Sequence, residues 1–126
     1  MASLLEIGAL GLAGAIGALA RYLLGHFVAE RVRSAWPWGT LLINISGAFC
    51  IGLLFALTER KLMAPALQLM LTTGFLGGYT TFSTMSWEGV QLAHRGSTQL
   101  SLLYLGGSLA LGLIAVALGL AVGWLG

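Results

Sequence analysis

Residues 72–88 of the chain read Thr-Thr-Gly-Phe-Leu-Gly-Gly-Tyr-Thr-Thr-Phe-Ser-Thr-Met-Ser-Trp-Glu, and nearly all of them fall in an uncharged run, residues 62–87. An uncharged, mostly apolar run of this length is typical of a membrane-spanning helix. Each glycine in a helix interior costs roughly 1 kcal/mol relative to alanine. Here the pair Gly77-Gly78 directly precedes a series of hydroxyl side chains. The segment therefore predicts a helix that is broken at about mid-bilayer depth.

A broken helix at that depth limits what this segment can do. Irregular backbone inside a membrane persists only where it is buried in protein or lines a polar cavity. Freed carbonyl groups can then bind a cation, and amides or helix ends can face an anion. The alternative is ordinary helix packing, with the hydroxyls bonded to their own helix. The density of hydroxyl groups favours the binding interpretation; these groups belong to Thr80, Thr81, Ser83, Thr84 and Ser86.

Further uncharged runs lie on both sides of this segment, at residues 7–20, 34–58 and 96–126. Only 8% of the 126 residues are charged and 58% are hydrophobic, whereas soluble domains carry about 25% charged residues. We therefore predict an all-α, multi-pass membrane protein. It has one domain, residues 1–126, with four transmembrane helices at about 4–29, 38–58, 65–94 and 98–124.

Small residues recur along the first and last predicted helices. Gly8, Gly11, Gly14 and Gly17 follow one another at a spacing of three, and Ala115, Gly119 and Gly123 at a spacing of four. In lipid, small residues allow helix backbones to approach closely. Both stripes therefore predict helix contacts.

The basic residues do not set a single orientation in the membrane. If the N-terminus is cytoplasmic, Arg60 and Lys61 are inside, and Arg31, Arg33 and Arg95 are outside. Orientation follows an excess of Lys and Arg in the cytoplasmic loops, and two against three leaves it undecided. Four helices from a chain of this length also enclose little space alone. Both observations indicate an antiparallel dimer whose chains insert in both directions.

The composition also excludes several classes of function. A net charge of +2 is too small for a nucleic-acid surface, which needs clustered Lys and Arg. The single cysteine, Cys50, has no partner for a disulfide, and no CxxC or Cys/His cluster is present. No nucleophile–base pair or acidic dyad occurs at catalytic spacing, so we do not expect an enzyme.

Other polar residues join the hydroxyls of the third segment. Asn44 lies in the second predicted helix, and Ser101, Tyr104 and Ser108 share one face of the fourth by helical periodicity. Taken singly, each is explained by helix packing or by a bond to backbone. Together they supply neutral donors, which replace the water of a small hydrated anion without trapping it. Phe82 fits this chemistry because an aromatic ring has a positive edge, although packing alone also explains it.

Three motifs resemble those of the Fluc (CrcB) fluoride channels: Gly-Ala-Leu-Ala-Arg-Tyr (17–22), Trp-Gly-Thr-Leu-Leu-Ile-Asn-Ile-Ser-Gly (38–47) and Gly-Phe-Leu-Gly-Gly-Tyr-Thr-Thr-Phe-Ser-Thr (74–84). The resemblance implies a passive fluoride-selective channel that exports fluoride across the bacterial cytoplasmic (inner) membrane. It also implies a dual-topology antiparallel homodimer with two pores and a structural sodium ion at its centre. Besides fluoride, the lipid bilayer and the second copy of the chain, it implies no protein or nucleic-acid partner.

The resemblance also assigns roles to individual positions. The sodium ligands would be the backbone carbonyls of Gly77 and Thr80 from both subunits. Arg21 and Glu88 would be vestibule or gating residues, and the role of Arg21 is open between anion attraction and structural pairing. The fluoride pathway would comprise Asn44, Phe82, Ser83, Thr84, Met85, Ser86, Tyr104 and Ser108.

Met85 departs from the family pattern, which commonly has a second phenylalanine at this place. Spacing three keeps it on the same helix face as Phe82, and the methionine side chain is polarizable and adaptable. Because it lacks a positive ring edge, we expect fluoride conduction to survive with an altered rate or affinity.

Two other functions fit the membrane character of the chain less well. A small multidrug-resistance-type exporter couples cation export to protons through a carboxylate deep in the membrane. Glu6 lies near the chain start and Glu88 near the end of the third helix, so neither is well placed. A haem-binding anchor would use His26 and His94, but both lie near predicted helix ends.

Overall fold

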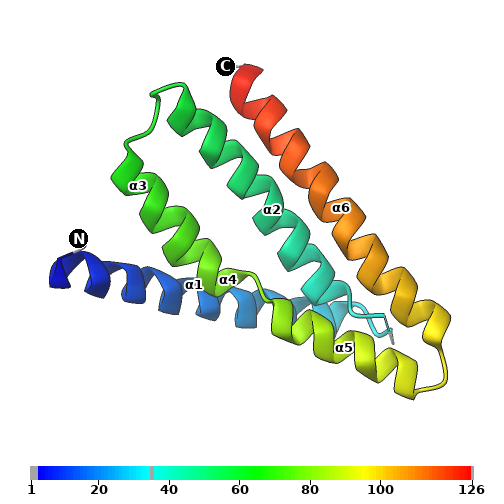
Figure 1. Ribbon diagram of the computed structural model, residues 1–126. Helices are drawn as coiled ribbons and strands as arrows, with labels where there is room; N and C mark the ends of the chain where they lie inside the picture. Colours follow the sequence, from blue (N-terminus) through cyan, green and yellow to red (C-terminus); the bar gives the residue numbers. More distant parts are fainter. Residues whose placement is uncertain (1–2, 35, 126) are drawn as a thin grey trace.

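The computed structural model describes residues 3–34 and 36–125, and over these ranges the chain is helical, with no strand (Figure 1). Met1, Ala2, Ala35 and Gly126, which the predicted domain includes, lie outside the described residues. The elements are α1 (Leu4–Arg31), α2 (Trp38–Glu59), α3 (Pro65–Leu69), the π-helical η1 (Met70–Leu76), α4 (Gly77–Tyr79), α5 (Phe82–His94) and α6 (Thr98–Leu125).

The three longest helices, α1, α2 and α6, have the length and apolar composition needed to cross a membrane, which supports the prediction of an all-helical membrane protein. Each begins at the residue expected from the sequence and ends within two residues of the expected end. Local sequence explains two of these starts. The Ser3 hydroxyl accepts a hydrogen bond from the Glu6 amide before α1, and Pro37, which has no amide to leave unpaired, precedes α2.

The region predicted as the third helix, residues 65–94, is divided in the structure. It begins at Pro65 and ends at His94, but it consists of α3, η1, α4 and α5 in succession. Between α4 and α5, Thr80 and Thr81 are not helical. Both have extended backbone, with φ/ψ of −82°/156° and −148°/113°.

Helix α6 runs along α2 because glycines remove the side chains between them (Figure 1). A Cβ added to Gly119 would lie 2.1 Å from the Phe49 carbonyl oxygen, and one added to Gly52 would lie 2.3 Å from that of Val116. Ala115, Gly119 and Gly123 are all buried. The predicted packing stripe on the last helix is therefore confirmed.

Helix α1 crosses η1 and α4 at a similarly close contact. A Cβ on Gly17 would lie 2.0 Å from the Phe75 carbonyl oxygen, and one on Gly78 would lie 2.1 Å from that of Gly14. Gly8 and Gly11, by contrast, have open space around them. The predicted stripe on α1 thus makes contacts within the chain only in its C-terminal half, because the N-terminal part projects beyond the helices it crosses (Figure 1).

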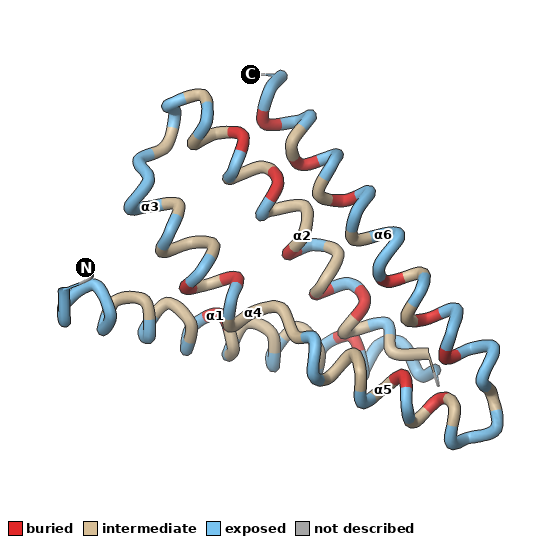
Figure 2. Tube along the Cα trace, in the orientation of Figure 1, coloured by how far each residue is buried: buried red, intermediate tan, exposed pale blue. Residues whose placement is uncertain are grey.

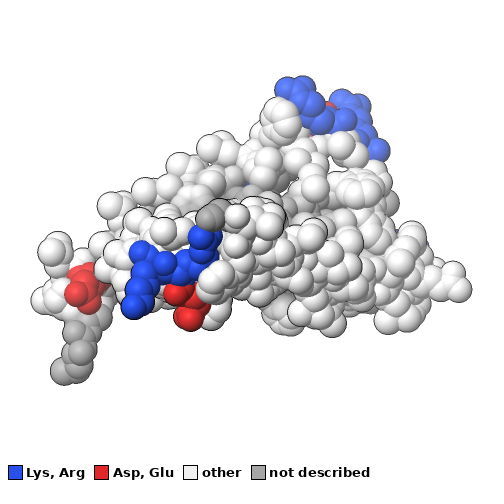
Figure 3. Space-filling view, turned by 90° about the horizontal axis from the view of Figure 1, so that it is seen from above, with Lys and Arg blue, Asp and Glu red and all other residues white. Residues whose placement is uncertain are grey.

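Much apolar surface of the chain is exposed. Buried positions follow the facing sides of α2 and α6, whereas α1 is mostly exposed (Figure 2). Charged side chains gather at separate places on the surface, with broad uncharged areas between them (Figure 3). Large exposed apolar areas mark contact with lipid or with another protein chain.

The contact between α1 and η1 generates a stability prediction. Gly17→Ala should lower the free energy of unfolding by about 1–3 kcal/mol, because the added methyl group overpacks a backbone contact. Gly8→Ala is the matched control, since alanine is the better helix former and no atom lies within 4 Å of its new Cβ. Thermal unfolding of the purified protein in detergent measures both. Equal effects of the two substitutions would contradict the packing described here.

Candidate functional site at the helix break

The break between α4 and α5 is fixed by an asparagine on α2. The Asn44 side-chain Nδ2 donates to the Thr81 carbonyl oxygen at 3.1 Å, and the Thr81 amide donates to Asn44 Oδ1 at 3.0 Å. One carboxamide thus satisfies both backbone groups of the residue at which the helix is interrupted. Asn44 holds the break in place and retains one further Nδ2 hydrogen.

Thr81 also starts the next helix. Its hydroxyl oxygen accepts a hydrogen bond from the Thr84 amide at 3.2 Å, which is the usual role of an N-cap threonine. The same hydroxyl donates to Thr84 Oγ1 at 3.1 Å. On the other side of the break, the Leu76 carbonyl accepts from the Thr80 amide at 2.9 Å and from the Thr80 hydroxyl at 3.0 Å.

These bonds determine which carbonyls lose their helical donors. In a continuous helix, the amide four residues ahead donates to each carbonyl. The donor for Gly77 would be the Thr81 amide, which bonds to Asn44 instead. The donor for Thr80 would be the Thr84 amide, which bonds to the Thr81 hydroxyl. Gly77 is exposed and Thr80 is partly exposed. Carbonyl oxygens of unwound helices are suitable ligands for a hard cation such as sodium.

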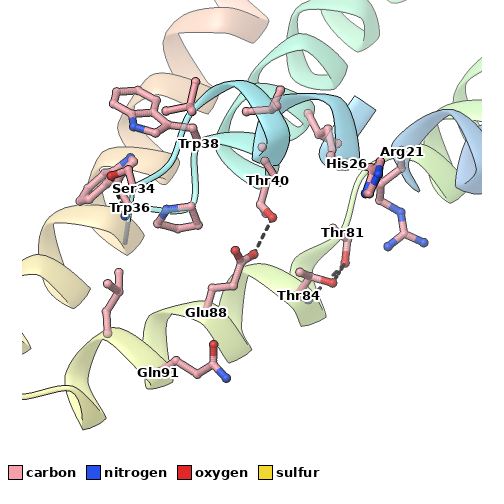
Figure 4. Close-up of a pocket in the computed structure, with 18 of the residues that line it drawn as sticks. Arg21, His26, Ser34, Trp36, Trp38, Thr40, Thr81, Thr84, Glu88 and Gln91 are labelled. Carbon is pink, nitrogen blue, oxygen red and sulfur yellow. Dashed lines mark hydrogen bonds between the residues drawn. The ribbon is translucent and has the colours of Figure 1, made fainter. Parts of the chain in front are cut away.

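A large cavity of about 540 Å³ lies between the C-terminal half of α1, the start of α2 and the inner face of α5 (Figure 4). Arg21, Arg33, Arg95 and Glu88 are the arginine and glutamate residues of its lining. The Thr40 hydroxyl donates a hydrogen bond to Glu88 Oε1 within it. The excess of guanidinium groups gives this cavity a positive character, which attracts small anions.

A small cavity of about 240 Å³ lies on another side of the break, and Asn44, Thr80, Phe82 and Met85 contribute to its lining. Phe82 is 78% exposed, which leaves its ring open to a neighbouring group. Met85 also packs against the buried cluster that contains Tyr104. Phe82 and Met85 thus share a face, as their spacing predicts.

The remaining hydroxyls of α5 are placed differently from one another. Thr84 lines the large cavity beside Thr81. Ser83 is exposed, with its hydroxyl 3.4 Å from that of Thr81. Ser86 is half-buried and lines neither of the two cavities.

The predicted polar face of α6 is buried. Ser101, Tyr104 and Ser108 all face the protein interior, and the Ser101 hydroxyl donates to the Gly89 carbonyl at 2.6 Å. The Tyr104 and Ser108 hydroxyls have no hydrogen-bond partner within the described chain. Buried polar groups are normally paired, so two such hydroxyls on one helix are unusual. They line neither of the two cavities, but Tyr104 belongs to the buried cluster against which Met85 packs.

Two residues of the site were not singled out from the sequence. Thr40 bonds to Glu88, and Trp36 packs edge-on against Tyr104 with ring centroids 5.5 Å apart. The Trp36 indole N–H is buried without a partner in the described chain. Thr40 could have been found from the sequence, because it lies four residues before Asn44 and therefore on the same face of α2.

The chain is similar to known proteins over most of its length. Residues 8–120 match the family model described as CrcB-like protein, Camphor Resistance (CrcB). A protein of Acidobacterium capsulatum named fluoride-specific ion channel FluC is 46% identical over 113 residues, covering 89% of this chain and 90% of the relative. A protein of the same name from Magnetococcus marinus is 46% identical over 120 residues, covering 94% and 98%. Fluoride-specific ion channel FluC 2 of Moorella thermoacetica is 47% identical over 109 residues, covering 86% and 88%.

The bonds between Asn44 and Thr81 generate a testable prediction. Asn44→Leu leaves an amide and a carbonyl without partners, and an orphaned buried group costs about 1–3 kcal/mol. Because 1.4 kcal/mol corresponds to a factor of ten, amide hydrogen exchange across residues 77–84 should accelerate about tenfold or more. Thr58→Ala is the control, since that hydroxyl lies on the same helix and donates to the Leu54 carbonyl, away from the break. Unchanged exchange in Asn44→Leu would show that the break is held by other contacts.

Proposed function

The chain belongs to the CrcB-like family, and from this membership we propose that it is a passive, fluoride-selective ion channel that exports fluoride from the cell. The observation that carries the proposal is the helix break held by Asn44 and surrounded by neutral hydroxyl and amide groups. Such groups can replace the hydration shell of a small anion. They bind it weakly enough for release, as conduction requires.

We propose that α3, η1, α4 and α5 together form a third membrane crossing, so that the chain crosses four times and its third crossing is interrupted near mid-membrane. The chain would act as a dual-topology, antiparallel homodimer in the bacterial inner membrane. The exposed ring of Phe82 and the exposed apolar surface of α1 support this arrangement, since a second copy would cover both. The undecided distribution of basic residues supports insertion in both directions.

The break would hold a structural sodium ion in that dimer. The carbonyls of Gly77 and Thr80 would supply its ligands, two from each protomer. Their helical donors are diverted to Asn44 and to the Thr81 hydroxyl, and both residues reach the surface of the protomer. The ion would supply positive charge that joins the two protomers at this point. The chain's own contribution is to present carbonyl oxygens that the helix no longer uses.

Fluoride would enter through the large cavity, where Arg21, Arg33 and Arg95 attract it and Glu88 is tied to Thr40. From there it would pass along neutral groups. On the break and α5 these are Asn44, the ring edge of Phe82, Met85 and the hydroxyls of Ser83, Thr84 and Ser86. The unpartnered hydroxyls of Tyr104 and Ser108 would extend the route from α6.

Such a channel would release fluoride that accumulates by weak-acid trapping. Hydrogen fluoride crosses a membrane as the neutral acid and ionises in a more alkaline cytoplasm, so the anion accumulates inside. A passive pore then lets it leave. Proton-coupled cation export, the alternative from the sequence, is not favoured because the relatives are named fluoride-specific channels.

Anion efflux from liposomes tests the proposal directly. Liposomes holding the purified protein and potassium fluoride should release fluoride rapidly, but only after valinomycin provides a path for the compensating potassium. Matched liposomes holding potassium chloride should release no chloride, and protein-free liposomes should release neither anion. Ion-selective electrodes measure both. Correctly folded protein that releases no fluoride would overturn the proposed function.

The departure at Met85 generates a second prediction. Met85→Phe should retain fluoride efflux, with a rate or apparent affinity changed by at most about tenfold, because an aromatic contact contributes about 0.5–1.5 kcal/mol. The same efflux assay measures it over a series of fluoride concentrations. Met63→Phe is the control, since Met63 lines neither cavity. Loss of flux in Met85→Phe with flux intact in the parent would show that the role assigned to this position is wrong.

A further inference from the structure

One bond at the break is made by a charged side chain from another helix. The Arg21 Nε–H on α1 donates to the Gly78 carbonyl oxygen at 3.2 Å. We propose that Arg21 is a positioning residue for the cation site: it engages the Gly78 carbonyl and so leaves those of Gly77 and Thr80 as the oxygens presented to the ion. This inference rests on the sodium site of the proposed function.

The close contact of α1 with η1 and α4 explains how Arg21 reaches the break. Gly14, Gly17 and Arg21 lie at i, i+3 and i+7 and therefore on one face of α1. The two glycines bring that face against the backbones of Phe75 and Gly78. The arginine, one turn beyond Gly17, is then held beside the end of α4 and is partly buried there.

Arg21 supplies a hydrogen-bond donor for a third backbone position at the break, the Gly78 carbonyl. In a continuous helix the Phe82 amide would donate to the Gly78 carbonyl, but α4 ends at Tyr79. The guanidinium replaces that amide, just as Asn44 accepts from the Thr81 amide. Without Arg21, the Gly78 carbonyl would be a further open acceptor, and the peptide plane that it shares with Tyr79 would be less restrained. The orientation of the neighbouring Gly77 carbonyl would then be lost.

The charge of Arg21 and its hydrogen bond to the Gly78 carbonyl would have opposite effects on sodium binding. Arg21 also lines the large cavity, on the side that α1 forms (Figure 4). If Arg21 acted on the cation only through its charge, it would repel sodium, and its removal would strengthen sodium binding. If it acts by positioning the backbone, its removal weakens sodium binding. The sign of the change therefore distinguishes the two roles.

The experiment measures the thermal unfolding midpoint of the purified protein in detergent as sodium chloride replaces N-methylglucamine chloride at constant ionic strength. In the parent, sodium should raise the midpoint and saturate. In Arg21→Gln, the sodium concentration at half-maximal effect should rise about tenfold. Arg33→Gln is the matched control, because Arg33 lines the same cavity and no hydrogen bond joins it to residues 76–81 in the described structure. Its sodium response should equal that of the parent.

Arg21→Lys provides a second variant if Arg21→Gln does not fold. It keeps the charge but replaces the planar Nε–H with a mobile ammonium group, so its sodium requirement should lie between those of the parent and Arg21→Gln. The inference is overturned if either folded variant reaches its half-maximal effect at a sodium concentration equal to or below that of the parent. A parent that conducts fluoride but shows no sodium response overturns the sodium site and the inference together. A parent that responds to sodium but conducts no fluoride overturns the channel function alone.

Discussion

The pair of hydrogen bonds between Asn44 and Thr81 is the interaction on which the site depends. Within hydrocarbon no water is available to a broken helix, and each unsatisfied backbone group costs several kcal/mol. An interruption in a membrane helix therefore exists only where another element supplies partners. In the third crossing that we propose, the Asn44 carboxamide would do so, because it carries both a donor and an acceptor at the spacing of one residue's amide and carbonyl.

The same bonds separate the carbonyl acceptors of the break from its hydroxyl and amide donors. Asn44 and the Thr81 hydroxyl occupy amides, and so the carbonyls of Gly77 and Thr80 lose their helical donors. Hydroxyls and the remaining amide hydrogen stay available on the side of α2 and α5. A cation and an anion can thus be served by adjacent parts of one short segment. Arg21 adds to this separation by engaging the Gly78 carbonyl from α1.

The sequence predicted the elements better than their contacts. Apolar runs located α1, α2 and α6 within two residues at each end, because helix bounds are set locally. The contact of Gly14 and Gly17, but not of Gly8, depends on where α1 crosses η1, and local periodicity does not encode crossing points. The bond from Thr40 to Glu88 was missed for the same reason. Such pairs become visible only when the helices are assembled.

The placement of charge is consistent with the weak binding that conduction needs. Arginines line the large cavity, where water still screens their attraction for an anion. Farther along the proposed route the donors are neutral, and a hydrogen bond from a neutral group contributes about 0.5–1.5 kcal/mol. Several such bonds in sequence replace a hydration shell without any one of them holding the ion. Arg21 fits this division, since it lines the large cavity and the bond from its Nε–H to the Gly78 carbonyl holds the guanidinium in place there.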